Sequence, residues 1–344
     1  MTPLVSVVTP VYNGERHLEE CIQSVLRQTC SDWEYVIVDN VSTDNTAAIA
    51  DRFAAQDPRI KVVHATEFLD IWGNHNRALQ HIDRDSQFCK FVQADDWMYP
   101  ECLERMLSVA QRTPSVGIVS AFGLSGMRVD LDGLFPYWQE VMPGPEALRR
   151  LLLGSWMGWV VGGPSCILLR ADLVRRQPEF FDRSIWHADA DAAFRQLVDS
   201  DLGFVHQVLT FMRAETPSRL TSFSWRVYSF LPMEGRMLIR YGRRVMSPTE
   251  YRAGVRRWFR RYARWLVTQC WRPSRLRQKE FQEFHAREIE AMLAEAVGDR
   301  ETRALLSLIR RLVHSRSGDA GPSRTPASSM AEGLTGAHAF STET

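Results

Sequence analysis

The stretch SVVTPVYNGERHLEECIQSVLRQTCSDWEYVIVDN (6–40) decides the fold class. It opens with a β-branched run, SVVTPVY (6–12), and closes with a near-continuous apolar run, WEYVIVDN (33–40). Between these runs, residues 17–29 carry apolar side chains at helical spacing. An apolar strand without alternation is typical of a parallel sheet that is covered on both faces. The stretch therefore predicts strand, helix and strand of a parallel sheet.

The same alternation continues to residue 122. The further strands that we predict are KVVHA (61–65), FCKFVQA (88–94) and VGIVSAF (116–122), and the further helices are 44–56, 74–82 and 101–112. Five strands that alternate with helices predict an α/β fold with a doubly wound, mainly parallel sheet. Ligands of such sheets bind at the carboxyl ends of the strands, so the residues that leave each strand are the candidates for a site.

Composition and missing motifs argue against several classes of protein. The length of 344 residues indicates one large domain or two modest ones. Hydrophobic residues make up 45% of the chain, which is enough to build a sizeable core. The net charge of +1 indicates no polyelectrolyte partner, and we expect no nucleic acid. No GxGxxG follows the first strand and no GxxxxGK[ST] occurs, which argues against a dinucleotide oxidoreductase and a P-loop NTPase.

Cysteines and one apolar segment bear on the compartment. The six cysteines form no CxxC pair, and their scatter is typical of free thiols in a reducing compartment. No signal peptide precedes the first apolar run, so we expect a cytoplasmic protein. Residues 151–169 carry no charge and are about long enough to span a bilayer. Four glycines and a proline disfavour a continuous helix there, and we predict buried loop and strand instead.

Two adjacent acids, Asp95 and Asp96, follow the predicted strand at 88–94. Neighbouring carboxylates repel each other unless a cation neutralises them. Hard oxygen ligands suit Mg²⁺ or Mn²⁺, which proteins often share with substrate phosphates. A solvated loop pair, or acids favoured at a helix N-terminus, would explain the same residues without a metal.

Other acids also have two interpretations each. Asp39 ends the second strand, where its carboxylate can accept a hydrogen bond from a nucleobase stacked on Tyr12, or can merely close a turn. Asp189 and Asp191 precede a helical pattern that starts near Ala192. An acid at that place can cap the helix or serve as general base for an acceptor hydroxyl.

Six segments, in this order, resemble the family 2 inverting glycosyltransferases with the GT-A fold. They are SVVTPVYNGERHLEECIQSVLRQT (6–29), WEYVIVDNVSTDNT (33–46), GNHNRAL (73–79), FVQADDWMYPECL (91–103), WHADADAAFRQL (186–197) and VLTFMRAE (208–215). The resemblance extends from about residue 3 to about residue 222. It implies a GT-A domain over residues 1–222, with a nucleotide-binding half at 1–122 and an acceptor-binding half at 123–222.

The resemblance also implies roles for particular residues. The residues expected to bind the donor are Pro10, Tyr12, Asp39, Asn76, Arg77 and Asp95. Asp95 and Asp96 would hold Mn²⁺ or Mg²⁺ beside the diphosphate, and Asp189 would be the catalytic base, while Asp191 matches a more structural neighbour. The implied reaction moves a sugar from a nucleotide-diphosphate sugar, most commonly of UDP, to a glycan or lipid-linked acceptor with inversion. Surface polysaccharide or glycolipid assembly is the expected setting.

Several positions depart from the family pattern. Asn40 and Val41 stand where Asp and Gly are usual, Gln93 stands for the first Asp of the metal segment, His75 stands for an Arg, Ala188 stands for a Glu, and Arg213 is followed by Ala214-Glu215 instead of a nearby His. These departures concern the nucleotide turn, a phosphate contact and the metal, and they leave the four principal acids in place.

The C-terminal third lies outside the resemblance. Residues 223–316 are predicted to be mostly helical, and residues 317–344 are predicted to form a disordered tail. Residues 252–277 contain nine arginines, no acid and aromatic side chains at helical spacing. Such a basic amphipathic helix can lie peripherally on the inner face of an anionic membrane. It can equally pack its aromatic face on the catalytic domain, which we favour.

Two other functions compete with glycosyl transfer. A metal-dependent nucleotidyltransferase can share the α/β sheet, but it needs a Gly-rich basic loop after the first strand, and VYNGERHL (11–18) offers one Gly. A non-enzymatic scaffold on the same fold would not need the four acids at the predicted site.

Overall fold

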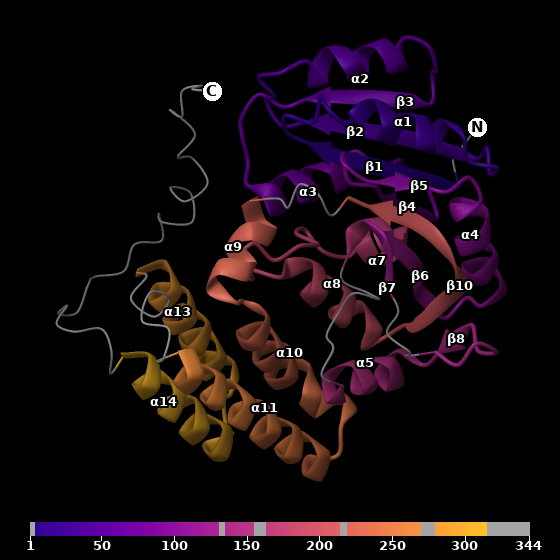
Figure 1. Cartoon of the computed structure of the whole chain (residues 1–344). Coiled ribbons are helices and arrows are strands. Elements are labelled where there is room, and N and C mark those ends of the chain that lie inside the picture. Colours follow the sequence, from indigo (N-terminus) through magenta and orange to yellow (C-terminus); the bar gives the residue numbers. More distant parts are fainter. Residues whose placement is uncertain (1–3, 131–134, 155–162, 214–218, 270–278, 315–344) are drawn as a thin grey trace.

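The structure is a computed structural model that describes residues 4–130, 135–154, 163–213, 219–269 and 279–314. A mixed sheet forms its body, and a group of helices from the C-terminal third packs against one side (Figure 1). The strands are β1 (Val5–Val11), β2 (Trp33–Asp39), β3 (Ile60–His64), β4 (Phe88–Phe91), β5 (Trp97–Met98), β6 (Val116–Ser125), β7 (Arg128–Asp130), β8 (Val141–Met142), β9 (Ile167–Arg170) and β10 (Asp201–Met212).

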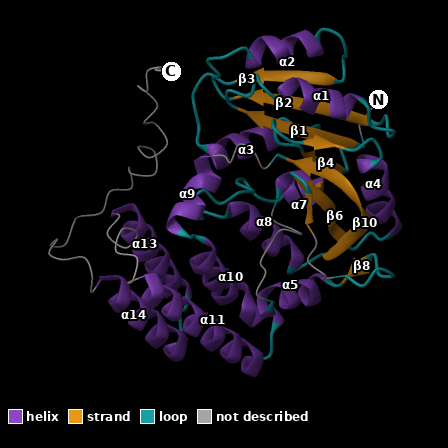
Figure 2. Ribbon diagram, viewed as in Figure 1, coloured by secondary structure: helices purple, strands orange, loops and turns teal. Residues whose placement is uncertain are grey.

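Helices cover both faces of the sheet and form the C-terminal group (Figure 2). They are α1 (Leu18–Leu26), α2 (Thr46–Ala54), α3 (Ile71–Leu79), α4 (Cys102–Arg112), α5 (Gly144–Leu153), α7 (Ala171–Arg175), α8 (Ala188–Leu197), α9 (Arg219–Val227), α10 (Phe230–Val245), α11 (Pro248–Gln269), α13 (Lys279–Glu295) and α14 (Arg300–His314), with a 3₁₀ turn η1 at Pro164–Cys166.

The N-terminal half confirms the predicted parallel sheet. β1 lies between β2 and β4 and pairs with both in parallel, and β2 pairs in parallel with β3. Every residue of β1 and β2 is buried, as expected for strands covered on both faces. Buried polar side chains in these strands are paired, since Thr9 Oγ1 donates to the Val92 carbonyl at 2.7 Å and Ser6 Oγ donates to Glu34 at 2.6 Å.

The second half of the sheet contains strands that the sequence did not predict. The strand order is β3-β2-β1-β4-β9-β6-β10-β5, and β9 runs antiparallel to both β4 and β6. β9 belongs to the apolar segment 151–169, which also contains the end of α5 and η1. Residues 155–162 of that segment lie outside the described residues. Within the described ranges, no helix has the length and apolarity to cross a bilayer.

The C-terminal helices pack through a shared apolar core. α10 contacts α5, α8, α11 and α13, and α14 contacts α11 and α13. The buried face of α11 consists of Tyr251, Val255, Trp258, Tyr262 and Leu266. In the described part of the basic stretch the aromatic face is buried, as predicted, but its partners differ from the prediction. It packs on the C-terminal helices instead of the catalytic domain, with Trp258 on Leu231 of α10 and Tyr262 on His285 of α13. Residues 270–278 and the tail at 315–344 lie outside the described residues.

We predict that the close approach of α10 and α11 depends on Gly235. A Cβ atom there would overlap the Trp258 indole, whose Nε1 donates to the Leu231 carbonyl at 2.8 Å and so cannot easily turn away. We expect Gly235→Ala to lower the free energy of unfolding in urea by about 1–3 kcal/mol. The matched control is Gly254→Ala, because its Cβ would meet only Leu238 at 3.5 Å. The control should leave stability unchanged or raise it by up to about 1 kcal/mol, and equal losses in both variants would contradict the prediction.

Candidate active site

The loops that follow β1 and β2 are joined by hydrogen bonds. Asn13 Oδ1 accepts from the Thr43 amide at 2.8 Å, and the Asn13 amide donates to Ser42 Oγ at 2.9 Å. The Gly14 amide donates to Thr46 Oγ1 at 2.8 Å. Asn13 has a φ of 51°, in the left-handed region that asparagine tolerates better than most residues. These bonds fix the two strand ends relative to each other.

Tyr12 and Pro10 lie at the carboxyl end of β1. Tyr12 is 44% exposed, and its ring meets the ring of Phe68 edge to face at a centroid distance of 4.9 Å. Pro10 is buried and lies opposite Val38, beyond the point where the ladder to β4 ends at Val8. Its missing amide hydrogen therefore removes no bond to β4. An exposed aromatic pair next to a rigid strand end offers a stacking surface for a flat ring.

Asp39 ends β2 and is buried. Its Oδ1 accepts from the Ser42 amide at 3.1 Å, so the turn-closing interpretation is realised. Its Oδ2 lies 3.6 Å from His64 Nδ1, and His64 Nε2 lies 3.0 Å from Asp51. Burial disfavours the charged imidazole, but the bonds to Asp51 and Asp39 outweigh burial and raise the pKa of His64. Turn closure leaves Oδ2 of Asp39 beside the His64 imidazole, whose protonated form these carboxylates favour.

The turn after β2 keeps a left-handed residue although it lacks glycine. Val41 has a φ of 63°, a conformation that a β-branched side chain rarely adopts. Asn40 replaces the usual acid, and its amide pairs with the Leu69 backbone in both directions: Nδ2 donates to the carbonyl at 2.8 Å and Oδ1 accepts from the amide at 3.0 Å. An aspartate could accept only, so the asparagine holds the loop before α3 with one more bond.

Arg77 and Asn76 of α3 are held by the backbone of neighbouring loops. Arg77 donates to the Glu67 carbonyl at 3.1 Å and to Asn40 Oδ1 at 3.3 Å. Asn76 pairs with both backbone groups of Phe181, each at 2.8 Å. The described contacts of these two residues are structural, and a direct contact with the donor stays a prediction for both.

His75 and Gln93, two of the departures from the family pattern, contact each other. Their Nε2 atoms lie 2.8 Å apart, and His75 Nδ1 lies 2.7 Å from the Ile71 carbonyl. Burial lowers the pKa of His75 to about 4, so the imidazole is neutral at physiological pH. A neutral pair therefore joins α3 to the end of β4 where the family usually has an Arg and an Asp.

Asp96 is buried and its carboxylate has defined partners. Oδ2 accepts from Ser165 Oγ at 2.5 Å, and Oδ1 accepts from the Arg213 amide at 3.2 Å. Burial, and then the charge of Asp95, raises the pKa of Asp96 to about 7. Arg213 also donates through Nε to the Asp95 carbonyl at 3.2 Å. The bonds from Ser165 and Arg213 and the charge of Lys90 lower the pKa of Asp96, but burial and Asp95 outweigh them.

The residues at this place suit a divalent cation shared with a ligand. Among the described residues, no group of three or more His, Cys, Asp or Glu side chains could hold a metal alone. Asp95 and Asp96 supply two hard carboxylates, which is what sites that share Mg²⁺ or Mn²⁺ with phosphates commonly provide. The raised pKa of Asp96 fits this chemistry, because a bound cation would favour the ionised form.

Sequence reasoning missed the residues beneath Asp96. Lys90 is fully buried in β4, and its Nζ donates to the Ser165 carbonyl. Ser165 Oγ also accepts from the Gln93 amide at 3.0 Å. Burial lowers the pKa of Lys90. The lone lysine in the apolar strand FCKF could have pointed to a buried polar site, whereas nothing in the sequence around Ser165 indicated its role.

The structure places Asp189 and Asp191 inside α8 instead of before it. The helix begins at Ala188 after His187, so the predicted start near Ala192 is wrong, and neither acid is the N-cap. Asp189 is half-buried, and its Oδ1 accepts from the Ala190 amide at 2.9 Å. Burial raises the pKa of Asp189 to about 6. Asp191 is fully buried and bonded to α10.

Helix α3 links the three groups of acids. Asn40, next to Asp39, and Gln93, whose carbonyl accepts from the Asp96 amide at 3.0 Å, both contact α3 side chains. On the other side, Trp72 Nε1 donates to the Trp186 carbonyl at 3.3 Å, just before α8. The ends of β2 and β4 and the start of α8 are thereby held around one helix.

Comparisons with known proteins give the family. The family model described as "Glycosyl transferase family 2" matches residues 6–161, from β1 past the acids that follow β4. Residues 6–161 form a domain of glycosyl transferase family 2. The family 2 domain is 30% identical over 152 residues to "Putative teichuronic acid biosynthesis glycosyltransferase TuaG" of Bacillus subtilis, covering 44% of this chain and 60% of the relative. In three curated relatives the match covers 60%, 45% and 65% of the relative's own length.

Solved structures support the GT-A-like fold. S. aureus TarS 1-349 in complex with UDP-GlcNAc has a TM-score of 0.59 and 15% identity, covering 90% of both chains. The mannosyltransferase PcManGT from Pyrobaculum calidifontis, in complex with GDP-Man and Mn²⁺, has a TM-score of 0.53 and 19% identity, covering 91% of this chain and 81% of that one. At these identities the likeness establishes the fold, and the predicted α/β, GT-A architecture is confirmed.

We predict that Val41 strains the turn that follows β2 in the family 2 domain. A left-handed conformation costs a residue with a Cβ about 1–2 kcal/mol, whereas glycine adopts it freely at an entropic cost of about 0.5–1 kcal/mol. Val41 is 40% exposed, so little packing is lost on substitution. We expect Val41→Gly to raise the free energy of unfolding in urea by about 0.5–1 kcal/mol. Val41→Ala keeps the Cβ and should change stability by less. Destabilisation by glycine would contradict a left-handed turn.

Proposed function

We propose that this family 2 chain transfers a sugar from a nucleotide-diphosphate sugar to an acceptor hydroxyl with inversion at the anomeric carbon. The observation that supports this most strongly is the arrangement around α3. That helix contacts the end of β2, the end of β4 and the segment before α8, each of which carries one of the acids the reaction needs. If these acids lay in separate regions of the molecule, each would only close a turn or cap a helix, and no shared site would exist.

In this proposal the donor's nucleotide lies at the ends of β1 and β2. The exposed ring of Tyr12, backed by Phe68, offers a face for the nucleobase. Asp39 Oδ2 accepts from the base, since Oδ1 closes the turn. Asp95, which is half-buried, would contact the ribose, and Arg77 of α3 would contact the phosphates.

Asp95 and Asp96 would hold the divalent cation, Mn²⁺ or Mg²⁺. When bound, the cation offsets negative charge on the departing diphosphate. Ser165 Oγ and the Arg213 amide fix the orientation of the Asp96 carboxylate in advance. The Mn²⁺ in the PcManGT complex supports a metal of this class.

Asp189 is the proposed general base. Its raised pKa, about 6, lies close enough to neutral pH for a carboxylate to be both ionised and basic enough to assist proton transfer. It takes the acceptor's hydroxyl proton as the oxygen bonds to the anomeric carbon, and the bond from that carbon to the diphosphate oxygen breaks on the opposite face. Attack from the face opposite the leaving group inverts the configuration.

UDP is the nucleotide we propose, and a surface polysaccharide or a glycolipid is the proposed product. The UDP-GlcNAc complex of TarS and the naming of TuaG for teichuronic acid biosynthesis support these classes. We also propose residue 222 as the end of the catalytic domain. A nucleotidyltransferase lacks support, because the loop after β1 has one glycine and is fixed to the β2 loop by side-chain bonds.

We predict that Asp189→Asn separates binding from chemistry. UDP with Mn²⁺ should raise the thermal midpoint of the wild type and the variant equally, whereas ATP should not. Transfer from UDP-sugars, measured as released UDP, should fall by a factor of about 100 or more in the variant, because asparagine cannot accept the proton. Wild-type kcat should also fall as pH drops below about 6, where Asp189 becomes protonated. Near wild-type transfer by the variant would exclude Asp189 as the base.

We further propose that the outer face of α11 contacts an anionic membrane surface. Arg252, Arg260 and Arg264 are exposed there at spacings of eight and four residues. By contrast, Arg256 pairs with Glu301, and Arg257 donates to the Leu153 carbonyl. The three exposed guanidiniums can face lipid phosphates while the aromatic side of the helix stays in the core.

We predict that replacing Arg252, Arg260 and Arg264 together by Gln weakens binding to phosphatidylglycerol vesicles. At about 1 kcal/mol for each arginine, the affinity in co-sedimentation should fall about 100-fold. Neutral phosphatidylcholine vesicles provide the lipid control, and Arg84→Gln, at an exposed position far from α11 in the sequence, provides the protein control. Equal binding of the triple variant and the wild type would exclude this surface.

A further inference from the structure

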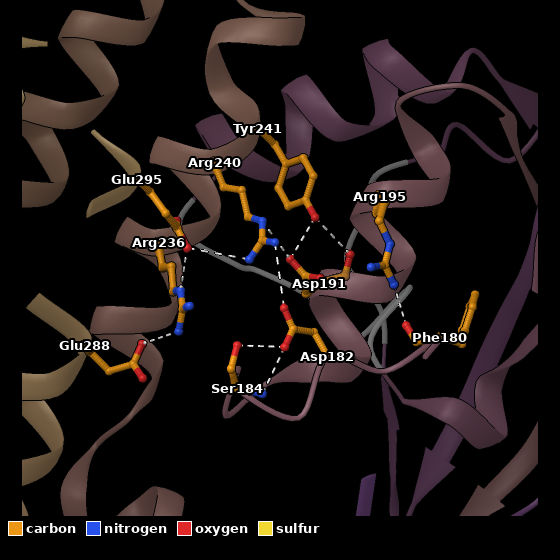
Figure 3. Close-up of polar contacts among 10 residues, drawn as sticks. All are labelled: Phe180, Asp182, Ser184, Asp191, Arg195, Arg236, Arg240, Tyr241, Glu288 and Glu295. Carbon is orange, nitrogen blue, oxygen red and sulfur yellow. Dashed lines mark hydrogen bonds and ion pairs between the residues drawn. The ribbon is translucent and has the colours of Figure 1, made fainter. Parts of the chain in front are cut away.

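Asp191 ties the start of α8 to helix α10. The Tyr241 hydroxyl donates to Asp191 Oδ1 at 2.7 Å and lies 3.3 Å from the Asp191 carbonyl oxygen. Arg240 Nε lies 3.5 Å from the same Oδ1. Figure 3 shows both α10 side chains directed at this carboxylate. One acid of α8 is thus held by two consecutive residues of α10, one neutral donor and one cation.

Arg240 also joins segments on either side of α8. Its guanidinium lies 3.8 Å from Asp182, in the loop before α8, and 3.5 Å from Glu295 of α13 (Figure 3). Asp182 is itself held by Ser184, whose amide and hydroxyl donate at 2.9 and 2.7 Å. The guanidinium therefore connects the loop, the catalytic helix and the C-terminal helices.

The network continues away from α8 through a second arginine. Arg236 is buried between Glu295 at 3.0 Å and Glu288 at 3.3 Å. The carboxylates of the network are Asp182, Asp191, Glu288 and Glu295. Two guanidiniums lie between these four carboxylates, so each cation has more than one acid to neutralise. Losing either cation would leave buried negative charge without compensation.

The N-cap residue of α8 has a matching contact. His187 Nε2 lies 2.8 Å from Ser229 Oγ, directly before α10 begins. Burial lowers the pKa of His187 to about 4, so this is a neutral hydrogen bond. The N-cap and the first turn of α8 are therefore both anchored to one end and one face of α10.

This anchoring controls the direction of Asp189. An α-helix turns about 100° per residue, so side chains two positions apart differ by about 200° and lie on opposite sides. We propose that Tyr241 and Arg240 are positioning residues which, through Asp191, fix the rotation of the first turn of α8 and so aim the Asp189 carboxylate at the acceptor hydroxyl. The inference rests on the proposed function, in which Asp189 is the base. It gives the C-terminal helices a part in catalysis beyond packing.

If the Asp189 carboxylate is displaced from the acceptor hydroxyl, proton transfer slows, whereas donor binding is unaffected. Misplacement by about 1 Å can cost about 100-fold in rate. The described side-chain contacts of Asp39 and Asp96 come from the β2 turn, from His64 of β3, from Ser165 and from Arg213, and none of these belongs to α10. Loosening of α8 should therefore change kcat and leave the KM for the donor alone.

The test is Tyr241→Phe, which removes one hydroxyl and keeps the ring that packs on Phe194. We expect kcat to fall about tenfold while the donor KM and the affinity for UDP with Mn²⁺ stay within twofold. Amides 190–193 of α8 should exchange with deuterium about tenfold faster. Tyr251→Phe is the matched control, because this buried tyrosine of α11 packs against Gly242 and not against Asp191. The control should leave kcat and α8 exchange unchanged.

A second pair of variants tests the cation. Arg240→Lys should keep more of kcat than Arg240→Gln, because it retains a positive charge beside Asp191. The positioning role would be overturned if Tyr241→Phe kept the wild-type kcat, or if Tyr251→Phe lost as much of it. The proposed function would still hold in that case, provided that the wild type transfers sugar and Asp189→Asn does not. No transfer by the wild type from any nucleotide sugar would overturn both.

Discussion

The candidate site depends on buried polar pairing between helix α3 and the segments around it. Asn40 pairs with the Leu69 backbone, Asn76 pairs with the Phe181 backbone, and His75 pairs with Gln93. Each asparagine bonds its partner through both amide atoms, so the geometry is fixed more tightly than by a single bond. His75 uses one ring nitrogen for Gln93 and the other for the Ile71 carbonyl. All three pairs are largely shielded from water, where an unmatched partner would cost about 1–3 kcal/mol. The strand ends and the start of α8 can therefore move little relative to α3.

This pairing explains how the chain tolerates its departures from the family pattern. The His75–Gln93 contact replaces a position pair that usually carries opposite charges, and burying a neutral pair avoids the desolvation of two ions. Because Gln93 carries no charge, Asp95 and Asp96 are the acids that directly follow β4. At the turn after β2, Val41 adopts the left-handed conformation of the usual glycine. The turn shape is thus preserved by the bonds of its neighbours, at the cost of local strain.

The sequence predicted the parts of the fold whose signal is local. The strands from β1 to β4 and the helices between them follow from apolar runs and helical spacing. β9 could not be predicted as an antiparallel insertion, because its four residues carry no sign of strand direction and its pairing depends on β4 and β6, which are remote in sequence. The start of α8 was misplaced because Ala188 and Ala190 are as buried as the later apolar residues but give a weak hydrophobic signal. The acids of the site were identified because each follows a predicted strand or precedes a predicted helix. Ser165, which bonds Asp96, and Lys90, which bonds Ser165, come together only when the strands assemble.

The C-terminal helices show why a region without family resemblance can still matter to a family 2 domain. A catalytic base on the first turn of a helix has little to hold it, since the first backbone amides of a helix lack partners within the helix. Here the opposite side of that turn carries Asp191, and the partners of Asp191 come from α10. A buried carboxylate is costly without such partners, so the folded state favours the one rotation of α8 in which Tyr241 and Arg240 meet it. In the proposed mechanism, the free energy that keeps Asp191 paired is the same free energy that aims Asp189 at the acceptor. The attachment of the helical region to the sheet domain is then part of how the proposed site is built.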